Sequence, residues 1–164
     1  QVLGGGQTSV LAEAMQFGSG NALYAGASYR PTALDDTTFT LVAVPRPGVP
    51  LAEIEAEMDG VVADFLAEGD IDNAQLDRIR FQLRASQIYE QDTVRSLANR
   101  YGTARAVGLS IEDIEAWPAL LQEITEEEII EAGRTVFDLD RSVTSWLTRP
   151  DADQPEAMQP EVTQ

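Results

Sequence analysis

Apolar residues recur with helical spacing along most of the chain and alternate with polar residues in only a few short stretches. The clearest helical pattern covers 51–68, where the apolar residues fall on one face and the acidic residues lie largely on the others. Helices are predicted over 2–18, 51–68, 74–90, 93–107 and 125–136, with a short helical piece after Ser110 that Pro118 interrupts or restarts. Strands are predicted over 22–29, 38–45 and 141–148.

Local capping signals set the predicted boundaries of these helices. Gly69 and Gly108 follow the ends of two helical patterns, where glycine accepts the left-handed backbone of a helix C-terminus. The candidate N-caps are Thr8 or Ser9, Asp72 or Asn73, and Thr125, which forms a capping box with Glu128. These signals predict separate helices joined by short loops.

The order of the elements is one helix, two strands, four or five helices and one strand, which predicts an α+β fold. The first two strands are expected to form an antiparallel hairpin with a long loop, and the helices to pack on one face of the sheet. Three strands make a small sheet, so we expect the chain to be a fragment that lacks an upstream strand. We assign residues 1–149 to one domain, and 150–164, which are polar and contain prolines, to a disordered tail.

The charge balance changes this picture more than the overall composition does. Eleven basic residues, all of them Arg, face 28 acidic residues, and the formal net charge is −17. Such a surface repels phosphate backbones and anionic membranes, so we expect neither a nucleic-acid partner nor a membrane. It could attract basic peptides, although an acidic surface is more often simply solvated. No apolar stretch approaches the length of a membrane span, and no signal peptide opens the chain.

The residue types that are absent exclude several kinds of chemistry. The sequence contains no His, no Cys and no Lys. A zinc site would therefore have to use carboxylates alone, which is poor ligation for zinc. Ser-His-Asp, Cys-His and lysine-based nucleophilic mechanisms are likewise excluded within this chain. We assign no metal and no cofactor to it.

The glycine run 4–6 and the acidic run 126–128 could each be a binding site, but each also has a simpler structural explanation. The run 4–6 of three glycines could bind phosphate at a helix N-terminus, but it lacks the spacing of known phosphate loops, so close backbone packing is the better hypothesis. The acidic run 126–128 lacks the loop of a calcium site, and the helix dipole already favours acids in a first turn. The arginines at 78, 80 and 84 are expected to form solvated ion pairs.

Two tyrosines mark the first predicted strand as a candidate binding surface. Tyr24 and Tyr29 lie at opposite parities of this strand, so one of them must face away from the core or sit at its edge. An outward tyrosine on a strand can contact a ligand, whereas a packed tyrosine is the more common case.

The chain as a whole resembles a known family through the order and spacing of several short segments. These are Leu3-Gly4-Gly5-Gly6-Gln7-Thr8-Ser9, Ala25-Gly26-Ala27-Ser28-Tyr29, Asp36-Thr37-Thr38-Phe39, Gln75-Leu76-Asp77-Arg78-Ile79-Arg80, Ala98-Asn99-Arg100-Tyr101-Gly102 and Ser142-Val143-Thr144. Together they resemble the later-half domain of pitrilysin/insulinase-type zinc peptidases. The resemblance covers nearly everything between Val2 and Thr148, and none of the segments is specific alone.

The resemblance implies half of a clamshell of duplicated α+β domains around a peptide chamber. The earlier half of such enzymes carries an inverted His-x-x-Glu-His zinc motif, where zinc polarises the scissile carbonyl and the Glu activates water. The later half closes the chamber, helps to hold the substrate and often contributes an Arg and a Tyr that stabilise the oxyanion. On this chain the Tyr position falls on Tyr24, which is expected to bind substrate. The Arg position falls near Met15 or Gln16, neither of which is Arg.

The expected function is therefore the substrate-enclosing, catalytically inactive C-terminal domain of a bacterial zinc metalloendopeptidase. Its expected partners are a peptide substrate and a zinc-bearing N-terminal half, upstream or in a partner subunit, and association into a homo-oligomer is left open. Bacterial relatives are often exported, which makes the periplasm the expected compartment. The alternatives are a non-catalytic structural relative, such as the core subunits of respiratory complexes, and an unrelated acidic interaction module.

Overall fold

The structure is a computed structural model that describes residues 1–69, 71–90 and 93–148. In chain order its elements are α1 (Val10–Ala12), the π-helix η1 (Glu13–Gly18), β1 (Ala22–Tyr29), β2 (Phe39–Pro45), α2 (Leu51–Glu68), α3 (Asn73–Glu90), α4 (Val94–Ala106), α5 (Ile111–Glu123), α6 (Glu126–Val136) and the 3-10 turn η2 (Leu139–Arg141). The tail predicted at 150–164 lies outside the described residues. No helix among the described residues is both long and apolar enough to cross a membrane.

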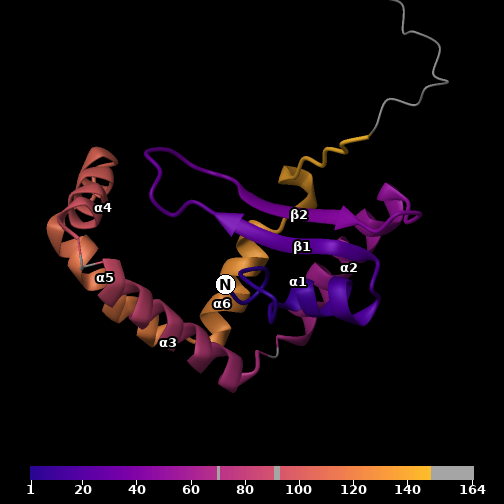
Figure 1. The fold of residues 1–164 in the computed structure, drawn as a ribbon, viewed down its shortest axis with the longest axis horizontal. Coiled ribbons are helices and arrows are strands. Elements are labelled where there is room, and N and C mark those ends of the chain that lie inside the picture. Colours follow the sequence, from indigo (N-terminus) through magenta and orange to yellow (C-terminus); the bar gives the residue numbers. More distant parts are fainter. Residues whose placement is uncertain (70, 91–92, 149–164) are drawn as a thin grey trace, which may run out of the picture.

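The two strands form an antiparallel hairpin with alternating faces (Figure 1). Ala25 and Ala27 turn toward the core, and so do their partners on β2, Ala43 and Leu41. Tyr24 and its partner Val44 turn away from the core. One extra residue on β1 shifts the register between Ala22 and Tyr24, a β-bulge at the start of the strand. The hairpin therefore has one buried face and one open face.

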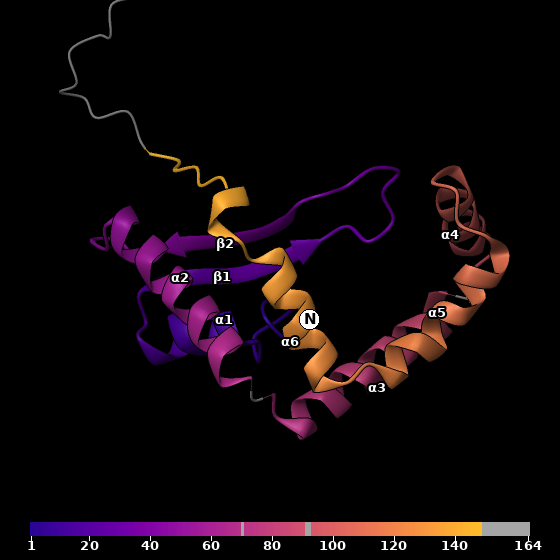
Figure 2. The ribbon, with the colours of Figure 1, turned by 180° about the vertical axis from the view of Figure 1, so that it is seen from behind.

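Helices α2 and α6 cover the buried face of the hairpin, as Figure 2 shows from behind. Between them and the strands lies one core of apolar side chains. Its fully or nearly buried members are Val2, Leu3, Leu11, Met15, Ala22, Ala25, Ile54, Val62, Phe65, Ile71, Leu76 and Ile130. The α+β fold with helices on one face of an antiparallel sheet is confirmed.

Helices α3, α4 and α5 form an arm that extends away from the hairpin and its helices (Figures 1 and 2). Polar contacts tie α3 to the end of α5: the Arg80 guanidinium donates to the Ile124 carbonyl at 2.7 Å, and the Gln122 amide donates to the Arg80 carbonyl at 3.3 Å. Arg84 also donates to Gln122, at 2.8 Å. Of the three arginines predicted to form ion pairs, Arg80 pairs with Asp77 at 3.0 Å. Arg80 and Arg84 also join α3 to the end of α5.

Most of the predicted helix boundaries are confirmed by observed caps. Gly69 adopts a left-handed φ of 62° after α2, and Gly108 has a φ of 90° after α4. Ser110 and Thr125 each form a capping box at the start of α5 and α6. Each side chain satisfies a backbone N–H that the helix leaves free, which explains why these boundaries could be predicted locally.

The predicted helix over 2–18 begins later than expected. Residues before Val10 fold back on themselves, with the Val10 N–H donating to the Val2 carbonyl at 3.2 Å. Ser9 occupies the cap position, but its hydroxyl donates to the Gly6 carbonyl at 2.6 Å and does not accept from a helix N–H. Three glycines make a helix unfavourable there, and the chain uses them for a compact turn.

Pro118 does not interrupt its helix, because α5 runs from Ile111 to Glu123 without a break. A proline removes the N–H that would reach the carbonyl four residues earlier, which here belongs to Ile114. The guanidinium of Arg100, on α4, donates to that carbonyl at 3.0 Å. A contact from the neighbouring helix thus replaces the hydrogen bond that the proline removes.

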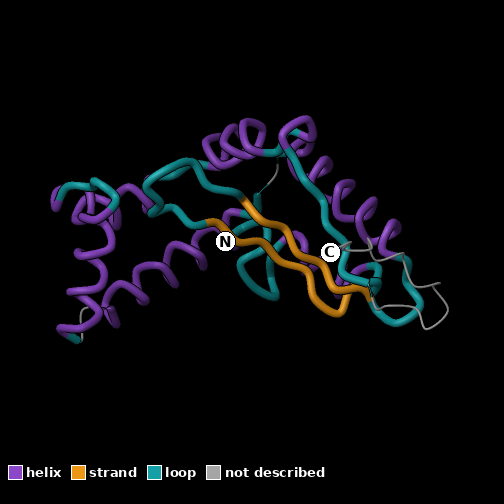
Figure 3. The backbone as a smooth tube through the Cα atoms, turned by 90° about the horizontal axis from the view of Figure 1, so that it is seen from above, coloured by secondary structure: helices purple, strands orange, loops and turns teal. Residues whose placement is uncertain are grey.

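The strand predicted over 141–148 is not formed, so the hairpin is the whole sheet in the described part of the chain. The segment begins in η2 and continues as a loop (Figure 3). The Trp146 indole donates to the Glu55 carboxylate of α2 at 2.9 Å. Val143 and Leu147 remain 96% exposed. Alternation shows that a segment can form a strand, but a strand also needs a neighbouring backbone to pair with.

Candidate functional site

The open face of the hairpin presents a small apolar surface centred on Tyr24. The Tyr24 side chain is 53% exposed and lies opposite Val44, with Val42 beside it on β2. Its ring leans along the strand over Gly26, where an added Cβ atom would lie 2.5 Å from the tyrosine hydroxyl oxygen. Glycine at this position lets the tyrosine ring and its hydroxyl lie close to the backbone of β1.

Tyr29 lies at the other end of β1 and belongs to the buried side of the hairpin. Its ring stacks on Phe39 with centroids 6.0 Å apart, and Phe39 in turn meets Phe137 edge-on at 5.1 Å. The prediction that one of the two tyrosines faces away from the core is confirmed. The structure places Tyr24 on the open face and Tyr29 at the edge of the core.

The outer edge of β1 is closed by two contacts that the sequence did not suggest. The Ala27 N–H donates to the Gly4 carbonyl at 3.0 Å, and the Gln16 amide donates to the Ala25 carbonyl at 3.1 Å. Gly4 lies so near β1 that an added Cβ would be 2.5 Å from the Cβ of Ala27 and closer still to its nitrogen. Close backbone packing is therefore what the glycine at position 4 provides, as predicted.

The two positions at which the resemblance would place an arginine have different surroundings. Met15 is completely buried in the core, whereas Gln16 is partly exposed and its amide is bound to Ala25. Both lie in η1, a π-helix in which the Ser19 N–H donates to the Ala14 carbonyl five residues earlier, at 2.9 Å. A π-helical turn of this kind is rare and often lies at functional sites.

The loop between η1 and β1 is anchored to α2 by one carboxylate. The Ser19 hydroxyl and the Asn21 amide donate to the two oxygens of Glu57 at 2.5 and 3.0 Å. Two residues further along α2, burial raises the pKa of the Asp59 carboxyl, and the charge of Glu55 raises it further. The sequence placed the acids of α2 largely away from its apolar face and did not indicate the contacts of Glu57, because Ser19 and Asn21 lie more than 30 residues away from it.

The acidic residues at the start of α6 accept hydrogen bonds from nearby backbone N–H groups. Glu126 accepts from the Ile71 N–H at 3.0 Å, and Glu128 accepts from the Thr125 N–H at 2.8 Å. These bonds, together with the position of the acids in a first helical turn, agree with the helix-dipole explanation. Nowhere in the described ranges do three metal-ligating side chains gather into a group that could hold an ion.

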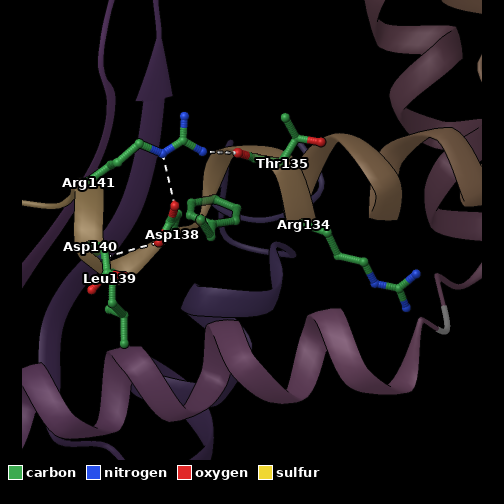
Figure 4. A pocket seen from close by; sticks show the side chains of 7 residues that line it. Arg134, Thr135, Asp138, Leu139, Asp140 and Arg141 are labelled. Carbon is green, nitrogen blue, oxygen red and sulfur yellow. Dashed lines mark hydrogen bonds and ion pairs between the residues drawn. The ribbon is translucent and has the colours of Figure 1, made fainter.

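A shallow hollow lies where α6 passes into η2, and Figure 4 shows its side chains. Arg141 is held between the Asp138 carboxylate at 2.9 Å and the Thr135 carbonyl at 2.8 Å. Arg134 points away from this pair and donates to the Leu66 carbonyl at 3.1 Å (Figure 4). Both cations already have partners, so the hollow has the character of a helix-end structure and not of an anion site.

Comparison with solved structures gives a likeness in fold. No protein-family model matches the chain, and no curated protein matches it. Among solved structures it is similar to a protease from Helicobacter pylori, with a TM-score of 0.75 and 18% sequence identity over 84% of this chain. The match covers 32% of that protease, so this chain spans about a third of its length. The likeness shows that the two share a fold in this region.

Proposed function

We propose that the chain is the substrate-enclosing C-terminal domain of a bacterial zinc metalloendopeptidase of the pitrilysin/insulinase type, with the zinc site in another half. The observation that carries the proposal is the fold shared with part of a much longer bacterial protease. A domain of this kind contributes a wall to a peptide chamber, and a partner half supplies the zinc chemistry. The resemblance of the sequence segments supports the same assignment.

The open face of the hairpin is the surface proposed to face the peptide. It is apolar around Tyr24, Val42 and Val44, and the Tyr24 side chain is about half exposed. Extended peptides offer both apolar side chains and backbone hydrogen-bonding groups, and a half-exposed tyrosine can contact both. The residues of the chain do not fit a zinc ion, because the sequence contains neither His nor Cys.

Tested alone, the 164-residue chain is expected to show no chelator-sensitive proteolysis and to bind no zinc. Hydrolytic zinc needs imidazole or thiolate ligands, and the chain has none. The measurement is cleavage of an unfolded protein such as casein with and without a chelator, together with zinc titration by calorimetry. Proteolysis by the pure chain that a chelator abolishes would refute the proposal.

Replacing Tyr24 with alanine is expected to weaken peptide binding about fivefold or more, because one aromatic contact is worth about 1 kcal/mol or more. The measurement is fluorescence anisotropy with labelled peptides from a casein digest. Tyr29→Ala is the matched control, because Tyr29 is equally exposed but lies at the core side of the strand. Equal losses for both variants would remove Tyr24 from the proposed site.

The second candidate function is a non-catalytic structural relative with the same fold. The specific observation in its favour is at the arginine position of the family pattern, where Met15 is buried and the Gln16 amide is bound to the backbone. Neither offers a charge to an oxyanion. The coding sequence upstream separates the two candidates: a His-x-x-Glu-His motif there favours the peptidase, and its absence favours the structural relative.

A further inference from the structure

The two edges of the hairpin differ in how far their backbone groups are already paired. In an antiparallel pair, opposed residues alternate between those bonded to each other and those whose N–H and C=O point outward. The Ala27 N–H and the Ala25 carbonyl point outward from β1, since they bond Gly4 and Gln16. Their partners on β2, Leu41 and Ala43, therefore direct their own N–H and C=O groups to the opposite edge.

That opposite edge, the outer edge of β2, is open. Within the described residues, no backbone hydrogen bond reaches Phe39, Leu41 or Ala43 from outside the hairpin. The nearest segment on that side, 142–148, diverges from β2, as Figures 1 and 2 show. An unpaired strand edge is a template for an added strand, and extended peptides bind many domains in this way.

The charges of helix α2 and of the whole chain favour a cationic occupant. Helix α2, which packs behind β2, has acids at 53, 55, 57, 59, 64 and 68 and contains no basic residue. The chain as a whole has a formal net charge of −17. This charge opposes the approach of a second copy and attracts a peptide that is rich in Arg or Lys.

We propose that the outer edge of β2 binds an extended cationic peptide as an added antiparallel or parallel strand. Main-chain hydrogen bonds to Leu41 and Ala43 hold the peptide, and its alternate side chains lie on the open face beside Val42 and Val44. Tyr24 is two strand spacings from the added strand, about 10 Å, a span that a long cationic side chain and the tyrosine ring cover together. The peptide nature of the occupant rests on the proposed function, which this inference deepens.

The test uses the whole 164-residue chain and two labelled eight-residue peptides, one of alternating Thr and Arg and one of alternating Thr and Glu. The Arg peptide is expected to bind at least tenfold more tightly than the Glu peptide at low salt. Ala43→Pro removes one outward N–H from an edge position where proline is tolerated, and is expected to weaken binding of the Arg peptide about tenfold. Ala43→Val is the matched control, because it also enlarges the side chain but keeps the N–H.

A second measurement needs no variant and guards against misfolding of Ala43→Pro. Addition of the Arg peptide is expected to slow amide hydrogen exchange at Leu41 and Ala43 at least tenfold, with little change at Gly26, which bonds within the hairpin. Slow exchange at Leu41 and Ala43 in the free chain would overturn the proposal, since the edge would already be covered by the chain itself. A dimer that Ala43→Pro dissociates would overturn it in favour of a second copy.

The proposed function and the edge inference can fail separately. If Tyr24→Ala abolishes peptide binding, while Ala43→Pro leaves binding unchanged and the peptide does not slow amide exchange in β2, the edge inference is wrong. The proposed function of the chain as a wall of the peptide chamber is unaffected by that result. If neither labelled peptide binds, the edge inference is also wrong, and the upstream zinc motif still decides the proposed function.

Discussion

Replacing Gly4 with alanine is expected to lower the free energy of unfolding by about 2–4 kcal/mol, a large part of the stability of a domain this size. An added Cβ at Gly4 would lie 2.5 Å from the Cβ of Ala27, which belongs to β1 and cannot rotate away. Relief requires the turn at 1–6 to move off the strand. That movement would break the 3.0 Å hydrogen bond from the Ala27 N–H and leave a backbone donor without a partner.

Gly6→Ala provides the control for this experiment within the same run of glycines. An added Cβ at Gly6 meets no atom within 4 Å, so this variant is expected to be as stable as the wild type or slightly more stable. Urea unfolding followed by tryptophan fluorescence measures both variants. Equal stability of the two would mean that the turn does not pack on β1 in solution.

The elements that could be predicted from the sequence are those whose causes are local. Helix α2 shows its helical period and its terminal glycine within 20 residues, and Thr125 and Glu128 form a capping box within a single turn. The hairpin of β1 and β2 follows from two apolar runs that are close in sequence. These features need no partner from elsewhere in the chain, so the amino-acid pattern is sufficient.

The predictions that failed depend on partners distant in sequence. Pro118 is accommodated because Arg100 on another helix bonds the Ile114 carbonyl. The predicted strand over 141–148 has the right alternation, but no neighbouring strand pairs with it. A local pattern shows what a segment can form, whereas the surrounding structure determines whether it does.

The sequence predicted an outward-facing tyrosine on β1, but not the contacts that distinguish the two edges of the hairpin. The alternation of side chains along a strand required one of Tyr24 and Tyr29 to face away from the core. Which of the two does so depends on the register of β1, which includes the bulge near Tyr24. The closed edge of β1 depends on Gly4 and Gln16, which reach it from a turn and a π-helix that the sequence pattern did not indicate. Neither element has a strong sequence signature, so the difference between the two sheet edges emerged only in three dimensions.

The surroundings of Met15 and Gln16 lead to the second large expected effect. Met15→Arg is expected to destabilise the chain by about 3–5 kcal/mol, because it places an unpaired charge in the core, where Met15 has no exposed surface. Gln16→Arg is expected to cost about 1 kcal/mol or less, since Gln16 is partly exposed and loses only its bond to the Ala25 carbonyl. The measurement is again urea unfolding of each variant.

Met15→Leu separates charge from shape at the buried position, because it nearly conserves volume and is expected to cost less than about 1.5 kcal/mol. If Met15→Arg is unstable while Gln16→Arg folds, position 16 is the one of these two at which the fold accepts a charged side chain. A stable Met15→Arg variant would instead show that the first helix can turn this position toward solvent, and the description of the core around η1 would be wrong.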